Sequence, residues 1–109
     1  MTTNRLQNSN ILKNVRISLP MKTPKQLERY FKGLANHRRV EMLILVSQNE
    51  GITLDEIAKR LDCNLKTISE HTRRLLQAGL LRKGYQGRAV CHSLSPYGKM
   101  FLEFISKIG

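Results

Sequence analysis

Two short helical patterns in the middle of the sequence are joined by a link of only two residues. The first pattern, TLDEIAKRL, begins with Thr53 three residues before Glu56, which is the spacing of a capping box. The link Asp62-Cys63 follows, and Asn64 is placed to cap the second helix. Two helices joined by so short a turn have the outline of a helix-turn-helix, and this outline constrains the fold more than any other part of the chain.

The second of these helices, predicted over residues 64–78, has two different faces. At about 100° per residue, one face gathers the residues suited to a core, namely Leu65, Ile68, Thr72, Leu75 and Leu76. The opposite face carries polar and basic residues, namely Lys66, Thr67, Glu70, Arg73, Arg74 and Gln77. The helix therefore has one side for packing and one side for a polar partner, and Gly79 is placed to end it.

Further elements flank this pair. Thr23-Pro24 begins a helical pattern, and Asn36 can cap another helix, HRRVEMLILVSQ, before the central pair. After the pair, LLRK and RAVCHSL have the character of two strands joined by GYQG, which predicts a β-hairpin with a basic projecting end. Ser95-Pro96 begins a last helix with an aromatic stripe, which must be buried on its own domain or against a second subunit.

Charge defines the class of partner. The chain has 109 residues with 19 Lys and Arg against 8 Asp and Glu, a formal charge of +11. Nucleic acid is the leading candidate, because basic groups gain free energy by releasing counterions from phosphates. A membrane surface is the rival, but the sequence has no spanning segment and no signal-peptide core, so we expect a cytoplasmic protein without a membrane partner. We expect one domain at 23–109 behind a basic, Asn-rich arm at 1–22.

The sequence predicts no cofactor, no metal and no enzymatic activity. Cys63 and Cys91 are expected to be small buried hydrophobic residues, because a disulfide is rare in a reducing compartment and two thiols do not complete a zinc site. Redox sensing by these cysteines, and a metal site from the three histidines, are less favoured alternatives. The sequence contains no phosphate loop, no HExxH motif and no nucleophile with a base and an orienting group.

The second helix of the pair contains TISEH and ends in QAGLL, and the second strand starts with GR. With these motifs the residues from about 34 to 94 resemble the ArsR/SmtB-type transcriptional regulators, and the order of helices and hairpin resembles a winged helix-turn-helix. The resemblance implies a mostly helical α+β fold with about five helices and a two-stranded wing. The arsenic- and cadmium-type sensors would have cysteines where Thr53 and Asp55 stand, and the last helix offers a zinc site only Glu103, so a metal-sensing role is not predicted.

The resemblance also implies which residues face DNA. Positions for base contact are Lys66, Thr67, Ser69, Glu70 and His71. Arg73 and Arg74 are placed for phosphates, and Glu70 would accept from a cytosine amino group or discriminate against wrong bases. The wing would contribute the residues Arg82, Lys83, Tyr85, Gln86 and Arg88.

Two functions follow from these features. The first is a sequence-specific double-stranded DNA-binding regulator, a homodimeric repressor that binds an inverted repeat with helix 64–78 in the major groove. Its first and last helices would form the dimer interface through Leu27, Tyr30, Phe31, Tyr97, Phe101, Phe104, Ile105 and Ile108. The alternative is a winged-helix architectural or protein-interaction module with little base specificity. The sequence points to no particular effector ligand.

Overall fold

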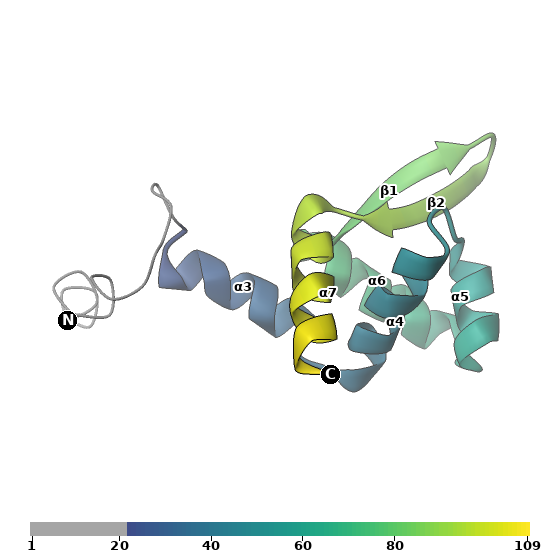
Figure 1. The fold of residues 1–109 in the computed structure, drawn as a ribbon. Coiled ribbons are helices and arrows are strands. Elements are labelled where there is room, and N and C mark those ends of the chain that lie inside the picture. The colour runs from purple at the N-terminus through teal and green to yellow at the C-terminus, as the bar shows by residue number, and fades with distance from the viewer. Residues whose placement is uncertain (1–21) are drawn as a thin grey trace, which may run out of the picture.

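The computed structural model describes residues 22–109, so the predicted arm at 1–22 lies outside the described residues except for Lys22. The elements follow in the order α3 (Pro24–Leu34), α4 (His37–Gln48), α5 (Leu54–Leu61), α6 (Leu65–Gln77), β1 (Leu81–Gln86), β2 (Ala89–Leu94) and α7 (Pro96–Ile108). Five helices and one antiparallel two-stranded sheet confirm the predicted winged helix-turn-helix for the described residues. The helix α3 and the hairpin extend in different directions from the body that the other helices form (Figure 1).

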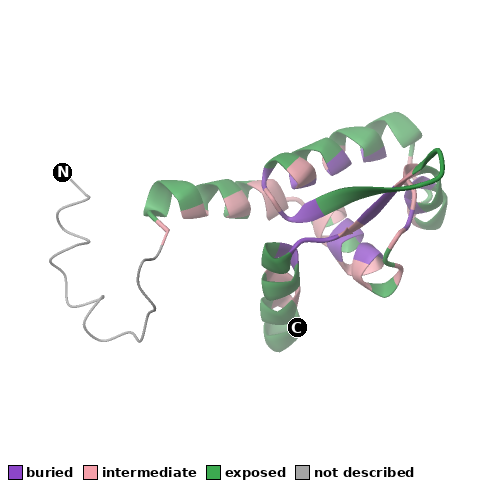
Figure 2. Cartoon of the chain, turned by 90° about the horizontal axis from the view of Figure 1, so that it is seen from above, coloured by how far each residue is buried: buried purple, intermediate pink, exposed green. Residues whose placement is uncertain are grey.

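The core lies where α4, α5 and α6 meet the base of the hairpin. Met42, Leu43 and Val46 of α4 are fully buried, and Ile57 of α5 and Ile68 of α6 meet them in one cluster. Burial is concentrated on the inner sides of these elements, whereas the outer end of the hairpin is exposed (Figure 2). Burial of apolar surface, worth about 25 cal/mol per Å², therefore holds α6 by one side and leaves its other side free.

Local caps define the helix pair as the sequence predicted. Thr53 and Glu56 form a reciprocal capping box at the start of α5. Asp62 adopts a left-handed conformation at φ 51° in the link, and the Asn64 side chain accepts hydrogen bonds from the backbone N–H groups of Lys66 and Thr67 at the start of α6. The residue at which α6 begins is therefore fixed by a cap in its own first turn.

The hairpin differs from the prediction at its tip. We expected GYQG to be the connecting loop, but Gly84 and Tyr85 belong to β1 and pair with Cys91 and Val90. The turn lies instead between the paired residues Gln86 and Ala89. Its first central residue is a glycine at φ +62°, and no non-glycine residue of the hairpin has a positive φ, a pattern of type II′ turns.

The last helix is fitted closely to the start of the hairpin. The Ser95 side chain caps α7 by accepting from the backbone N–H of Gly98, and its hydroxyl donates to the carbonyl oxygen of Gly79. An added Cβ at Gly98 would overlap the carbonyl oxygen of Leu80, so only glycine fits there. None of the helices within the described residues is long and apolar enough to span a bilayer.

Candidate nucleic-acid interface

The outer side of α6 presents most of the residues that the resemblance assigned to DNA contact. Lys66, Thr67 and Ser69 are exposed, and the backbone N–H groups of the first two donate to the side chain of the capping Asn64. Leu65, which we expected to face the core, is 47% exposed in the same first turn. Thr72 lies on the inner side, and its buried hydroxyl donates to the carbonyl oxygen of Ile68 at 2.8 Å.

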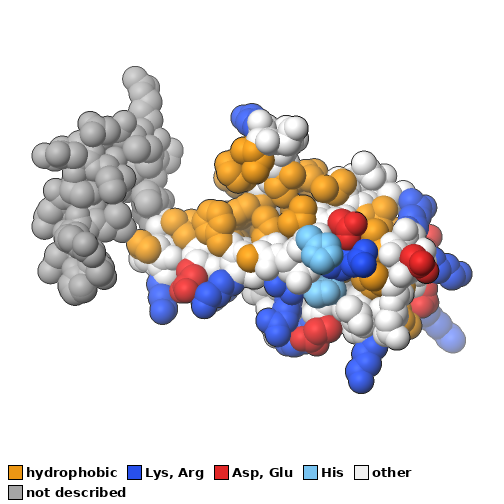
Figure 3. Space-filling model, turned by 90° about the horizontal axis from the view of Figure 1, so that it is seen from below, with side chains coloured by type: hydrophobic (Ala, Val, Ile, Leu, Met, Phe, Trp, Pro, Cys, Tyr) orange, Lys and Arg blue, Asp and Glu red, His pale blue; other side chains and the backbone are white. Residues whose placement is uncertain are grey.

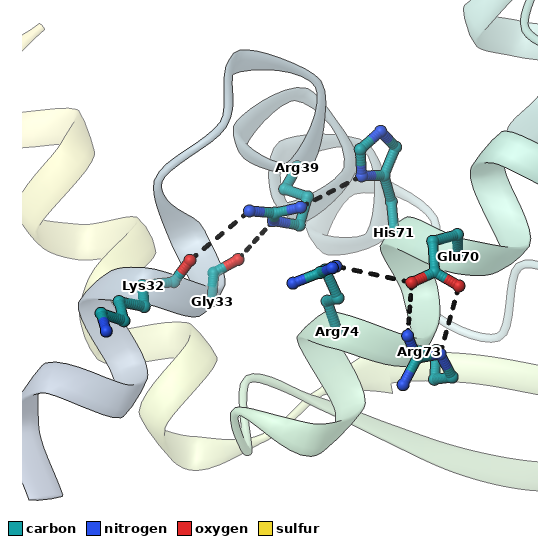
Figure 4. A network of polar contacts seen from close by, with 7 residues as sticks. All are labelled: Lys32, Gly33, Arg39, Glu70, His71, Arg73 and Arg74. Atoms are coloured by element: carbon teal, nitrogen blue, oxygen red, sulfur yellow. Dashed lines mark hydrogen bonds and ion pairs between the residues drawn. The ribbon is translucent and has the colours of Figure 1, made fainter.

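Glu70 is engaged with arginines of its own helix. Its carboxylate accepts two hydrogen bonds from Arg73, one of them from Nε at 3.2 Å, and forms an ion pair with Arg74 at 3.5 Å (Figure 4). The hydrogen bonds from Arg73 are the main reason why the pKa of Glu70 lies below its usual range. All three side chains are about half exposed. In the described structure the carboxylate therefore neutralises part of the basic surface beside it.

His71 lies apart from the other predicted base-contacting residues. Its ring is half-buried against α4, where Nδ1 is 3.2 Å from an Nη atom of Arg39 (Figure 4). Burial is the main cause of its lowered pKa, and the charge of Arg39 adds to the effect. A neutral ring can accept from the guanidinium through Nδ1, and a protonated ring cannot. His71 thus joins α6 to α4.

Arg39 is a functional candidate that the sequence interpretation missed. Besides contacting His71, its guanidinium donates to the carbonyl oxygen of Gly33 at 2.6 Å and to that of Lys32 at 3.4 Å. Burial and the positive charge of Arg74 lower the pKa of Arg39. Its partner on α6, His71, is 32 residues away along the chain, so no pattern among neighbouring residues predicts the contact.

The wing carries its predicted residues on an exposed ribbon. Beyond its first residue, Leu81, β1 has no buried position, and Tyr85 near its outer end is 71% exposed. The structure places all of the predicted wing residues at exposed positions, namely Arg82, Lys83, Tyr85, Gln86 and Arg88. Three residues separate the end of α6 from the start of β1, and the two elements are in contact.

The predicted dimer residues divide into two groups. Tyr30 and Phe101 pack on each other within the chain, with ring centroids 6.1 Å apart, and with Leu27 and Ile105 they are partly buried. Four others remain exposed, and Met100 of α7 is exposed beside them. We call this exposed set the aromatic face: Phe31, Tyr97, Met100, Phe104 and Ile108. Figure 3 shows hydrophobic side chains gathered on one part of the molecule and Lys and Arg mainly along other edges.

The cysteines and the other potential metal ligands of residues 22–109 are dispersed. These residues contain no group of three or more His, Cys, Asp and Glu side chains that could hold a metal ion. Cys91 is buried in β2 as expected, whereas Cys63 in the link is only partly buried. Both are free thiols.

Comparisons with known proteins give the arrangement a family context. A family model described as HVO_A0114 matches residues 34–100. Reduced HlyU from Vibrio cholerae is 25% identical with a TM-score of 0.69, over 77% of this chain and 88% of that one. The homodimeric winged helix-turn-helix DNA-binding domain of a possible ArsR-family transcriptional regulator from Mycobacterium bovis is 25% identical with a TM-score of 0.67, over 84% and 88%. No curated protein matches the sequence. The structural likenesses confirm the resemblance to ArsR/SmtB-type regulators.

Proposed function

Because this chain belongs to the HVO_A0114 family and is similar to winged-helix transcriptional regulators, we propose that it is a DNA-binding transcriptional regulator. In this proposal it is a homodimeric repressor that binds an inverted repeat in double-stranded DNA and acts in the cytoplasm without catalysis. The observation that carries the proposal is the exposed polar side of α6, continuous with a basic wing on a chain of charge +11.

The recognition step would be made by α6 in the major groove. A helix with its side chains is about 10–12 Å across and the groove is about 12 Å wide, so the helix can lie in it with its polar side against the bases. Lys66, Thr67 and Ser69 offer exposed donors and acceptors in the first turns. The wing residue Arg88 would contact the backbone, which adds affinity without sequence information.

The dimer would form through the aromatic face. Large side chains that remain more than half exposed, such as Phe104 at 54% and Ile108 at 69%, are usual at surfaces that a second molecule covers. A twofold pair of chains would present two copies of α6 to successive major grooves about 34 Å apart, and an inverted repeat would follow from that symmetry.

The test is a comparison of DNA affinities. Duplexes selected from a random pool by the full chain should contain an inverted repeat and bind at near-physiological salt roughly a thousand times more tightly than scrambled duplexes. A ratio near one would favour instead an architectural or protein-interaction module.

Two substitutions locate the specificity. Lys66→Ala should reduce the ratio between the selected and scrambled duplexes, because Lys66 would contact base edges. Arg88→Ala should weaken both duplexes about equally and lower the salt dependence, because Arg88 would contact phosphate. If both variants weakened the two duplexes equally, α6 would not be the source of specificity.

A further inference from the structure

A basic groove separates α3 from the C-terminal half of α6. Its volume is about 350 Å³, and it is lined by Arg29, Lys32, Gly33, Arg74, Gln77 and Ala78. Only Arg74 of these residues belongs to the DNA-contacting set that the resemblance implied. The groove therefore continues the polar side of α6 onto a helix that the sequence assigned to dimer formation alone.

Close packing fixes the two walls of this groove. An added Cβ at Gly33 would overlap that of Ala78, so α3 and the end of α6 meet at a distance that only glycine allows. Arg39 of α4 also binds the end of α3, because its guanidinium donates to the carbonyl oxygens of Lys32 and Gly33. The basic side chains of the two helices are thus kept side by side.

The charges around the groove are not balanced. Lys32 pairs with Glu28 at 3.2 Å and Arg74 with Glu70 at 3.5 Å, but each carboxylate is shared with a second cation. Arg29 forms no ion pair with any residue from 22 to 109. Three cationic side chains therefore face the groove with less than their own charge in carboxylates.

We propose that this groove holds a backbone phosphate of the bound duplex, next to the major groove that α6 enters. The proposal rests on the proposed function and adds Arg29 and Lys32 to the DNA-binding surface. Because α3 extends away from the hairpin (Figure 1), phosphate contacts would be made from α3 as well as from the wing. The protein would then hold the DNA backbone at two places around each recognition helix.

A duplex fits the groove better than a free small anion does. The side chains of Lys32 and Arg74 are 77% and 56% exposed, so each contact with an anion is screened by water. An exposed ion pair strengthens association at most about fivefold, and three such pairs alone would bind a free anion only weakly. When α6 is already bound in the major groove, the neighbouring phosphate is held near these side chains. Its ion pairs with them then cost little further loss of freedom, so they increase the affinity for the duplex by their full factor.

The test is a salt titration of duplex binding with the full chain. The double variant Arg29→Gln with Lys32→Gln is compared with a control that removes the same charge from exposed sites on α7, Lys99→Gln with Lys107→Gln. Loss of the contact with this phosphate should reduce the magnitude of the slope of log K against log salt by roughly 0.9 per protomer. Affinity for a random-sequence 30-base-pair duplex should fall by up to about eightfold per protomer at 0.1 M salt, and the control should stay within about twofold of wild type.

Two further measurements test whether the charge of these side chains is what matters, and whether the groove binds a duplex phosphate or a free anion. The charge-conserving pair Arg29→Lys with Lys32→Arg should keep the wild-type slope. Inorganic phosphate, titrated without DNA at constant ionic strength, should give no saturating shift of the Gly33 and Ala78 amide signals below about 10 mM. Saturation below about 1 mM would identify a site for a free anion and overturn the proposal.

The failures of the two proposals are distinguishable. If wild type binds no duplex, the proposed function fails and this inference fails with it. If wild type binds while the glutamine pair on α3 behaves like the pair on α7, only the groove assignment is wrong.

Discussion

Glu70→Gln should increase the affinity of this protein for DNA of any sequence. The carboxylate holds the guanidinium of Arg73 through two hydrogen bonds and that of Arg74 through an ion pair. Glutamine keeps the size and a carbonyl acceptor but loses the charge. Both arginines then become available to phosphates, and the net charge of the three residues rises from +1 (two cations less one carboxylate) to +2.

Counterion release gives the magnitude. One additional phosphate contact steepens the salt slope by about 0.9 per protomer and raises affinity by up to about eightfold at 0.1 M salt, with no gain at 1 M. Because the gain is independent of sequence, scrambled duplexes should benefit at least as much as the selected site. The ratio of the affinity for the selected site to the affinity for scrambled duplexes should therefore fall or stay unchanged while both affinities rise.

Fluorescence anisotropy with labelled duplexes across a salt series measures these changes. Glu103→Gln on α7 is the matched control, because it makes the same charge change at an exposed position of another helix. An unchanged salt slope in Glu70→Gln, or a slope no steeper than that of the control, would refute the argument. Weaker binding of the selected site alone would show that Glu70 accepts from a base instead.

Three further predictions concern stability and assembly. Gly33→Ala should lower the free energy of unfolding by about 1–3 kcal/mol through overlap with Ala78, and adding Ala78→Gly should restore much of it in denaturant titrations. The pKa of His92 is lowered mainly by burial, so the unfolded chain binds its proton more readily and stability should fall as pH decreases through the ordinary histidine range; thermal melts at pH 7.5 and 5.5 should differ less in His92→Gln. Phe104→Glu should shift the sedimentation of a dimer to that of a monomer that still unfolds cooperatively, because this side chain is 54% exposed within one chain; a monomeric wild type would contradict it.

Elements with local signals were predictable from the sequence. The caps Thr53 and Asn64 act on backbone groups within three residues of themselves, so their patterns alone place the helix starts. The hairpin turn was misplaced because both glycines of GYQG look like turn residues. Cross-strand pairing with Cys91 keeps Gly84 in β1, whereas Gly87 meets the demand for a positive φ.

Roles that depend on distant residues were not predictable. The family resemblance placed His71 with the base-contacting residues, but its ring is held by Arg39 of another helix. The helical period also placed Leu65 on the inner side of α6, but this side chain is 47% exposed. The pairing of Glu70 with Arg73 and Arg74 follows the ordinary three- and four-residue spacing of a helix and could have been foreseen.

The contacts of Arg39 have a consequence for the spacing of DNA sites. The guanidinium of Arg39 on α4 joins the end of α3 to α6, so the helix of the proposed dimer interface and the helix of the proposed DNA interface are linked through one side chain. In a dimer, the angle and separation of the two recognition helices would then be built into the protein. Insertion of five base pairs between half-sites, about half a helical turn, should abolish cooperative binding, because no hinge between these helices is available to follow the rotated site.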